Sequence, residues 1–316
     1  MPEEQAVSGS TVRSVVVGVD ASTHARAALD WAADEAVLRG VPLRIAHAWT
    51  PAPHRVPGTD GLGAAKSMLQ AAEEMLARAG SRVQERHSGL RVEFEVLPEE
   101  AVPGLIRLAE DAELLVVGSR GLSRFSSVLI GSVSQSLVAH ASCPVVVFRG
   151  ASEAIDPSPA DSAVEPGGAA TVPGPGAVVL GAAPGEVAGP VEFAFAEAAR
   201  RGVSLVAVRT WMYPASYGGY MVMPPDDSEQ RNGEENRDLL EVLAAARKEY
   251  PDVKVFTEVG MNEPASTLVH VSAGAGLVVL GADRHRNRFA LPIGRVAQQV
   301  LHHAHAPVAV VPHGHR

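Results

Sequence analysis

The sequence has one cysteine, no long apolar run and fewer basic than acidic residues. The single Cys143 excludes an internal disulfide, which fits a reducing compartment. A formal net charge of -9 argues against a general nucleic-acid binder. No apolar run approaches the roughly 20 residues of a membrane-spanning helix, and the polar start has no signal-peptide pattern. We therefore expect a cytoplasmic protein with no nucleic-acid or membrane partner.

Familiar catalytic and metal-binding patterns are also missing from the sequence. There is no Gly-Lys-Ser/Thr of a P-loop, no zinc-ligand spacing, no nucleophile elbow and no paired-carboxylate arrangement. Histidines crowd the C-terminal end, but no Asp, Glu or Cys lies among them. A solvated helix end is the preferred interpretation over a metal site. We predict no catalytic residues and no metal ligands, and we interpret His47 as a core residue and Cys143 as structural.

What the chain does have is an internal duplication. Four pairs of landmarks are each separated by 163 residues: Gly18 and Gly181, Gly118 and Gly281, Gly131 and Gly294, and Pro144 and Pro307. Residues 151–176 between the copies are rich in proline and glycine, and such a composition is typical of a linker. The chain of 316 residues is therefore divided into a first domain at 13–150, a linker at 151–176 and a second domain at 177–313.

Strand and helix patterns alternate along the first copy. Residues 14–19 form a short β-branched run, as in a strand that is buried on both faces. Ser22 or Thr23 can cap a helix that Gly40 ends. Further strands are expected at 43–49, 92–97, 114–117 and 144–149, and helices at 64–87, 103–110 and 132–141. This alternation predicts right-handed β-α-β units around a parallel sheet, with ligands at the carboxyl ends of the strands.

A glycine-rich segment follows the strand expected at 114–117. It reads Gly118-Ser119-Arg120-Gly121, nine further residues, and then Gly131-Ser132 at the start of a predicted helix. Glycine permits close approach of the backbone to a ligand, and a helix start offers unpaired N–H groups. Together these features suit a phosphate.

With these motifs the chain resembles the universal stress protein family in its tandem-domain, ATP-binding form. The resemblance rests on residues 17–22, 43–48, 118–134 and 143–147, and it is weaker in the second copy. It implies two tandem doubly wound α/β domains, each with a five-stranded parallel sheet of order 3-2-1-4-5. It also implies a regulatory role in the stress response and ATP as the ligand. Because no residue stands out as placed to activate water, we expect at most weak ATP hydrolysis. We expect the phosphates to carry Mg²⁺, with ligands mainly from the nucleotide and water.

The resemblance assigns the nucleotide site to the first domain. Asp20 would contact the nucleoside or serve as a turn residue, and the two roles are compatible. Ala48 would contribute backbone groups to the adenine. Arg120 and Arg124 either reach phosphate oxygens or are solvated loop residues. The full expected set is Gly18, Asp20, Ala48, Gly118, Arg120, Gly121, Arg124, Gly131, Ser132, Val133 and Ser134.

The second copy departs from this motif. Ala183 stands where the offset of 163 places Asp20, Arg284 where it places Gly121, and Arg295 where it places Ser132. We predict one ATP per chain, held by the first domain. The second domain is then either a degenerate copy retained for packing or a site for a different anion.

Three further expectations concern function and assembly. The main hypothesis is an ATP-binding stress regulator; the alternatives are a scaffold in which ATP is only structural and a weak adenine-nucleotide hydrolase. The domains are expected to pair through their last strands, 145–148 and 308–311, because an unpaired apolar edge is a liability. A protein partner of unspecified identity is expected, and a homodimer stays open.

Overall fold

The computed structural model describes residues 13–49, 61–119, 130–149, 174–183, 185, 188–213, 227–283 and 293–314. The first domain contains β1 (Ser14–Gly18), α1 (Thr23–Arg39), β2 (Leu43–Ala48), α2 (Gly61–Arg86), β3 (Val92–Leu97), α3 (Ala101–Ala109), β4 (Ala112–Gly118), α4 (Ser132–His140) and β5 (Val145–Phe148). The second contains β6 (Val178–Gly181), α5 (Ala188–Arg201), β7 (Leu205–Thr210), α6 (Ser228–Glu249), β8 (Val255–Gly260), α7 (Pro264–Val271), β9 (Leu277–Asp283), α8 (Arg295–His303) and β10 (Val308–His313). Of the predicted linker, only 174–176 lie within the described residues.

The helix boundaries follow from local chemistry. Ser22 caps α1, because its Oγ accepts a hydrogen bond from the N–H of Ala25 at 3.1 Å. Gly40 ends the helix in the left-handed conformation with φ 67°. These two predictions are confirmed. Helix α3 begins at Ala101, two residues earlier than predicted, because Pro103 falls in the first turn, where its missing N–H costs no helical hydrogen bond.

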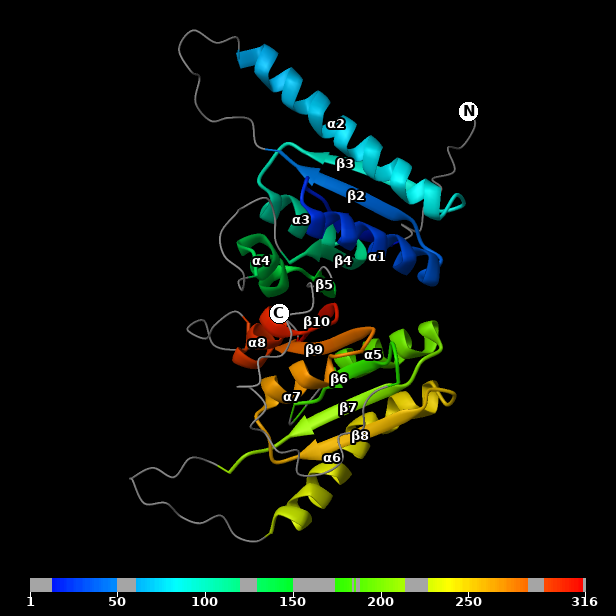
Figure 1. Cartoon of the computed structure of the whole chain (residues 1–316), viewed down its shortest axis with the longest axis vertical. Coiled ribbons are helices and arrows are strands. Elements are labelled where there is room, and N and C mark those ends of the chain that lie inside the picture. The colour runs from blue at the N-terminus through cyan, green and yellow to red at the C-terminus, as the bar shows by residue number, and fades with distance from the viewer. Residues whose placement is uncertain are drawn as a thin grey trace, which may run out of the picture.

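The sheet has the predicted order in both domains. The described strands form one sheet in the order β3-β2-β1-β4-β5-β10-β9-β6-β7-β8, so each half reads 3-2-1-4-5 from its outer edge (Figure 1). Pairing is parallel within each half. The central strands are buried on both faces, which explains their continuous runs of valine and leucine.

The two halves meet at the seam, which is the antiparallel pair formed by β5 and β10. Val147 lies opposite Val308, Val146 opposite Ala309, and Val145 opposite Val310. The prediction that the domains pair through their last strands is therefore confirmed. Each strand covers the edge that the other would expose, and Figure 1 shows the sheet passing from one domain into the other at this point.

Helices cover both faces of the joined sheet. Buried side chains from α1, α2, α5 and α6 form one apolar layer, with Leu29 and Phe195 among its largest fully buried members. Side chains from α3, α4, α7 and α8 form the other layer, which includes Leu137 and Leu301. Because each layer contains residues of both domains, the hydrophobic core is continuous across the seam.

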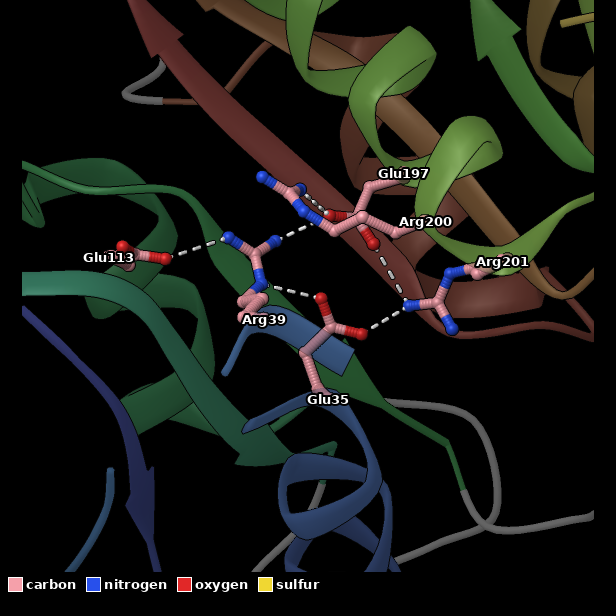
Figure 2. Close-up of polar contacts among 6 residues, drawn as sticks. All are labelled: Glu35, Arg39, Glu113, Glu197, Arg200 and Arg201. Carbon is pink, nitrogen blue, oxygen red and sulfur yellow. Dashed lines mark hydrogen bonds and ion pairs between the residues drawn. The ribbon is translucent and has the colours of Figure 1, made fainter. Parts of the chain in front are cut away.

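A polar cluster lies within this apolar surrounding where α1 meets α5. We call it the seam cluster; it comprises Glu35, Arg39, Glu113, Glu197, Arg200 and Arg201 (Figure 2). Glu35 and Glu197 are each 1% exposed. Arg39 contacts Glu35 at 2.6 Å and, across the domains, Glu197 at 2.5 Å. Arg201 makes the reciprocal pair of contacts, with Glu35 across the domains and with Glu197 at 3.0 Å.

Charge compensation explains how the seam cluster tolerates burial. Burial alone lowers the pKa of Arg39, but the carboxylates of Glu197 and Glu35 outweigh it and raise this pKa above its ordinary value. Burial and the charge of Glu35 raise the pKa of Glu197, against the opposing effect of Arg39 and Arg201. Two aromatic rings add to the cluster, since Arg39 lies over Phe193 and Arg201 over Trp31. The sequence analysis did not predict this arrangement.

Candidate functional site

The candidate site lies where the strand order of the first domain reverses, between β1 and β4. Helices α1 and α4, which follow these strands, cover opposite faces of the sheet, so their starts leave a space at the carboxyl ends of the strands. A pocket of about 300 Å³ occupies this position. Its lining consists of Gly18, Val19, Asp20, Ala25, Ala46, His47, Ala48, Ala101, Leu105, Val117, Gly118, Gly131, Ser132, Val133 and Ser134.

The pocket brings together eight of the eleven predicted site residues, namely Gly18, Asp20, Ala48, Gly118, Gly131, Ser132, Val133 and Ser134. They come from three separate strands and from the start of α4, so the fold assembles them from distant parts of the sequence. The remaining three, Arg120, Gly121 and Arg124, lie outside the described residues.

The start of α4 supplies the hydrogen-bond donors of the pocket. Gly131 is the N-cap residue, with φ -68° and ψ 151°, and Ser132, Val133 and Ser134 form the first turn. The N–H groups of a first turn have no acceptor within the helix, and the helix dipole makes this end positive. Ser132 is exposed, so its hydroxyl is accessible from the pocket. The arrangement favours an anion such as phosphate.

Two groups expected to face a ligand are engaged inside the protein instead. The N–H of Gly131 donates to the carbonyl oxygen of Ser119 at 2.8 Å. The hydroxyl of Ser134 donates to the carbonyl oxygen of Gly118, also at 2.8 Å. These bonds tie the start of α4 to the end of β4. They position the free end of the helix rather than add donors to the pocket.

Gly118 has a packing role that the sequence analysis did not predict. A Cβ at this position would lie 2.9 Å from the backbone carbonyl carbon of His24 and 3.1 Å from the backbone nitrogen of Ala25. The glycine therefore permits α1 to approach β4 closely, in addition to lining the pocket. At Gly18 a Cβ would meet Leu105 at 3.0 Å, a tight contact with a side chain.

Asp20 performs the turn role expected of it. The N–H of Ser22 donates to Asp20 Oδ1 at 2.9 Å, which fixes the turn between β1 and α1. The side chain is half-buried and lines the pocket. A contact with a nucleoside is compatible with this geometry and stays a prediction.

His47, at the end of β2, is a pocket residue that the sequence analysis interpreted as core. Its Nδ1 lies 2.8 Å from the carbonyl oxygen of Val19, which can only accept, so Nδ1 carries a proton. In the neutral ring, Nε2 is then an acceptor. The sequence did contain a signal that His47 would line the pocket, because it directly precedes the predicted site residue Ala48 at the carboxyl end of a strand.

The same edge of the second domain is tied together by its own side chains. Arg209, at the end of β7, donates to Glu235 of α6 at 2.7 Å, and Trp211 donates to Asn232 at 2.7 Å. In the first domain, Trp49 is the counterpart of Trp211, and its buried Nε1 has no hydrogen-bond partner within the described residues. The two domains thus differ in polar contacts as well as in motif.

The motif positions of the second domain are partly described. Ala183 follows β6 where Asp20 follows β1, and Arg295 is the first residue of α8, after the N-cap Gly294. Arg284 lies outside the described residues. Within the described part of the chain, no group of three or more His, Cys, Asp or Glu residues is arranged to hold a metal ion. None of the helices described there is long and apolar enough to cross a membrane.

Comparison with known proteins agrees with this geometry. The sequence model of the Universal stress protein family matches residues 11–149 and 186–312. The chain belongs to the universal stress protein family. Both halves match, so it is a tandem member with two such domains.

Individual known proteins are similar to this chain over different shares of its length. A universal stress protein of Mycobacterium tuberculosis is 34% identical over 303 residues, covering 94% of this chain and 96% of the relative. A crystal structure of a universal stress protein from Archaeoglobus fulgidus covers 95% of this chain and 98% of its own, with a TM-score of 0.63 and 16% identity. A structure of a universal stress protein from that organism in complex with dAMP covers 43% of this chain at 30% identity, with a TM-score of 0.32.

Proposed function

We propose that the first domain binds ATP together with Mg²⁺ and that the protein is a cytoplasmic stress regulator whose state depends on the bound nucleotide. The observation that carries the proposal is the pocket at the carboxyl ends of β1 and β4, closed on one side by the start of α4. Its volume of about 300 Å³ is at the lower end of ordinary ligand sites.

The residues present fit the parts of a nucleotide. The first-turn N–H groups of α4 and the Ser132 hydroxyl suit phosphate oxygens, which accept several hydrogen bonds. The Asp20 carboxylate suits the hydroxyls of a ribose, and the backbone of Ala48 suits the edge of an adenine ring. When Mg²⁺ accompanies the phosphates, water and the nucleotide supply most of its ligands.

The second domain is proposed to bind no ATP. Ala183 removes the carboxylate, and Arg295 replaces the hydroxyl at the helix start. Each lost hydrogen bond costs about 1–2 kcal/mol of binding free energy, which corresponds to roughly 5- to 30-fold in affinity. The combined loss supports a stoichiometry of one ATP per chain.

The test is isothermal titration calorimetry of the full chain with ATP and Mg²⁺. Asp20→Ala and Ser132→Arg reproduce the second domain's residues in the first, and each is expected to raise the Kd by roughly 5- to 30-fold. The matched control is Ala183→Asp, which adds the carboxylate to the second domain and is expected to leave affinity and stoichiometry unchanged.

The outcomes separate the proposal from its alternatives. Failure of the wild-type chain to bind ATP, or two equivalent ATP molecules per chain, would contradict the proposal. Release of inorganic phosphate measured on the same samples identifies the alternative enzyme: rapid turnover indicates an adenine-nucleotide hydrolase. Binding without turnover supports a regulator or a scaffold. A regulator is expected to bind a partner with an affinity that ATP changes, whereas a scaffold is not.

A further inference from the structure

One hydrogen bond joins the second domain directly to the nucleotide pocket of the first. The backbone N–H of Ile130 donates to Nδ1 of His302 at 3.2 Å. His302 lies on α8, whereas Ile130 immediately precedes Gly131, the N-cap residue of α4. The two residues are 172 positions apart in the sequence, so only the joined fold brings them together.

We propose that His302 is a positioning residue for the nucleotide site of the first domain. By accepting the hydrogen bond of Ile130, it fixes the point at which the chain enters α4, and therefore the direction of the N–H groups in the first turn. The inference rests on the proposed function, because it assigns the second domain a role in phosphate binding by the first.

Burial makes this acceptor necessary. Ile130 is 7% exposed and belongs to the apolar layer that includes Leu137 of α4 together with Val300 and Leu301 of α8. A buried backbone N–H must find an acceptor. Ile130 lies before the N-cap, so the helix offers it none. Its side chain thus belongs to an apolar layer that extends into the second domain, and its N–H bonds to that domain directly.

Three hydrogen bonds converge on this short segment. Gly131 is held by the carbonyl oxygen of Ser119, and Ser134 holds the carbonyl oxygen of Gly118. Both of these lie within the first domain, and the bond between Ile130 and His302 is the one that crosses between domains. The first two tie α4 to the end of β4, whereas the third ties the segment to α8. Without it, the start of α4 keeps its tether to the strand and loses its support from α8.

The chemistry of the bond specifies the state of the imidazole. An amide N–H can only donate, so His302 Nδ1 must carry no proton, and the neutral ring has its proton on Nε2. Asparagine offers an acceptor of similar reach, since its Oδ1 occupies a position close to that of Nδ1. Alanine offers no acceptor. The pair of substitutions therefore separates loss of the acceptor from loss of the ring.

The contact has no counterpart in the opposite direction. With the offset of 163, Ile293 corresponds to Ile130, and Ala139 corresponds to His302. The alanine side chain has no acceptor, so a mirror-image bond from the first domain to the second cannot form. The second domain, whose motif has changed, therefore supplies a hydrogen-bond acceptor to the first domain, whose motif is complete. Figure 1 shows α4 and α8 close to the seam, on either side of it.

The test is calorimetry on the full chain with ATP and, separately, with adenosine. His302→Ala is expected to raise the Kd for ATP about threefold to tenfold, less than the loss of a hydrogen bond made to ATP itself, because His302 acts through the position of α4. The Kd for adenosine is expected to rise less than twofold. His302→Asn is expected to return the ATP Kd to within about twofold of wild type. The control is His303→Ala, an exposed neighbour on the same helix, which is expected to change neither Kd.

A merely structural role gives a different pattern. If His302→Ala weakens ATP and adenosine equally, if His302→Asn does not restore ATP binding, or if the ATP Kd stays at the wild-type value, the inference is wrong while the proposed function stands. If the wild-type chain binds neither ligand, the proposed function fails and the inference fails with it. Melting temperatures without ligand verify that each variant is folded.

Discussion

Arg39 provides the sharpest test of how the two domains are held together. It contacts Glu35 and Glu197, each 1% exposed, and lies 3.4 Å from Glu113. Arg39→Met keeps most of the aliphatic stem and removes the charge. The buried carboxylates of Glu35 and Glu197 then keep their ion pairs with Arg200 and Arg201 but lose the positive charge of Arg39.

Breaking a buried ion pair by removing one partner costs about 3–5 kcal/mol of unfolding free energy. Unfolding entropy is about 2.1 cal/mol/K per residue, so a chain of 316 residues that unfolds as one unit has about 0.7 kcal/mol/K. Arg39→Met is therefore expected to lower the Tm by about 4–7 °C. If the first domain unfolds separately, the decrease is larger, because the same free energy acts on a smaller entropy.

Differential scanning calorimetry at neutral pH measures this change. The control is Arg82→Met, which breaks an exposed pair with Asp30 and is expected to cost at most about 1 kcal/mol. The double variant Arg39→Met with Glu197→Gln removes the uncompensated charge as well, and it is expected to recover much of the lost stability. A Tm decrease no greater than that of the Arg82 control, or a double variant no better than the single one, would refute the reasoning.

Two further predictions concern packing and pH. Gly118→Ala is expected to lower the free energy of unfolding, measured in urea, by about 1–3 kcal/mol, because its Cβ would lie 2.9 Å from the His24 backbone. Gly89 has open space around it, so Gly89→Ala is expected to leave the free energy of unfolding nearly unchanged. The pKa of Glu197 is higher in the folded protein than its ordinary value. The protonated Glu197 therefore stabilises the folded state fully below the ordinary pKa, and this stabilisation is lost as the pH rises through the pKa of the folded state. Glu197→Gln is therefore expected to gain stability relative to wild type from pH 4 to pH 8, and an unchanged difference across that range would contradict the shift.

Most of the fold was predictable because its signals are local. The β-branched runs mark strands that are buried on both faces, and Ser22 and Gly40 mark the ends of α1 by capping chemistry. The constant offset of 163 indicates two copies, and two apolar last strands indicate edges that must be covered. These features depend on short stretches of sequence, and the structure follows them.

The seam cluster could not be predicted from local sequence signals of this kind. Glu35 and Arg39 have the spacing of an exposed pair on a helix surface. In the structure both contact residues of α5, and Glu35 is buried. The signal that existed was repetition: Glu197 and Arg201 have the same spacing, at an offset of 162. A charged pair repeated in both copies indicates a reciprocal contact between them, which periodicity within one helix cannot show.

The sequence indicated which segments would meet at the pocket better than it indicated their contacts. Residues from three strand ends and one helix start were expected to meet, and eight of the eleven predicted residues line the pocket. Their part in ligand binding stays a prediction. The engagement of Gly131 and Ser134 inside the protein depends on how closely the start of α4 packs against the end of β4, which the sequence does not specify. The reason for Gly118 depends on how closely α1 packs, which is a tertiary property.

The second domain illustrates how one copy of a duplicated fold can lose a site without loss of its structural role. Its contributions to the first domain come from β10, from Glu197 on α5 and from His302 on α8. Ala183 and Arg295, the described positions where its motif departs, are different residues from those that make these contacts. Substitution at the motif therefore leaves the seam intact, whereas substitution at β10 or His302 acts on the domain that keeps the motif. Under the proposed function, the first domain needs the second as a support even if the second never binds a nucleotide.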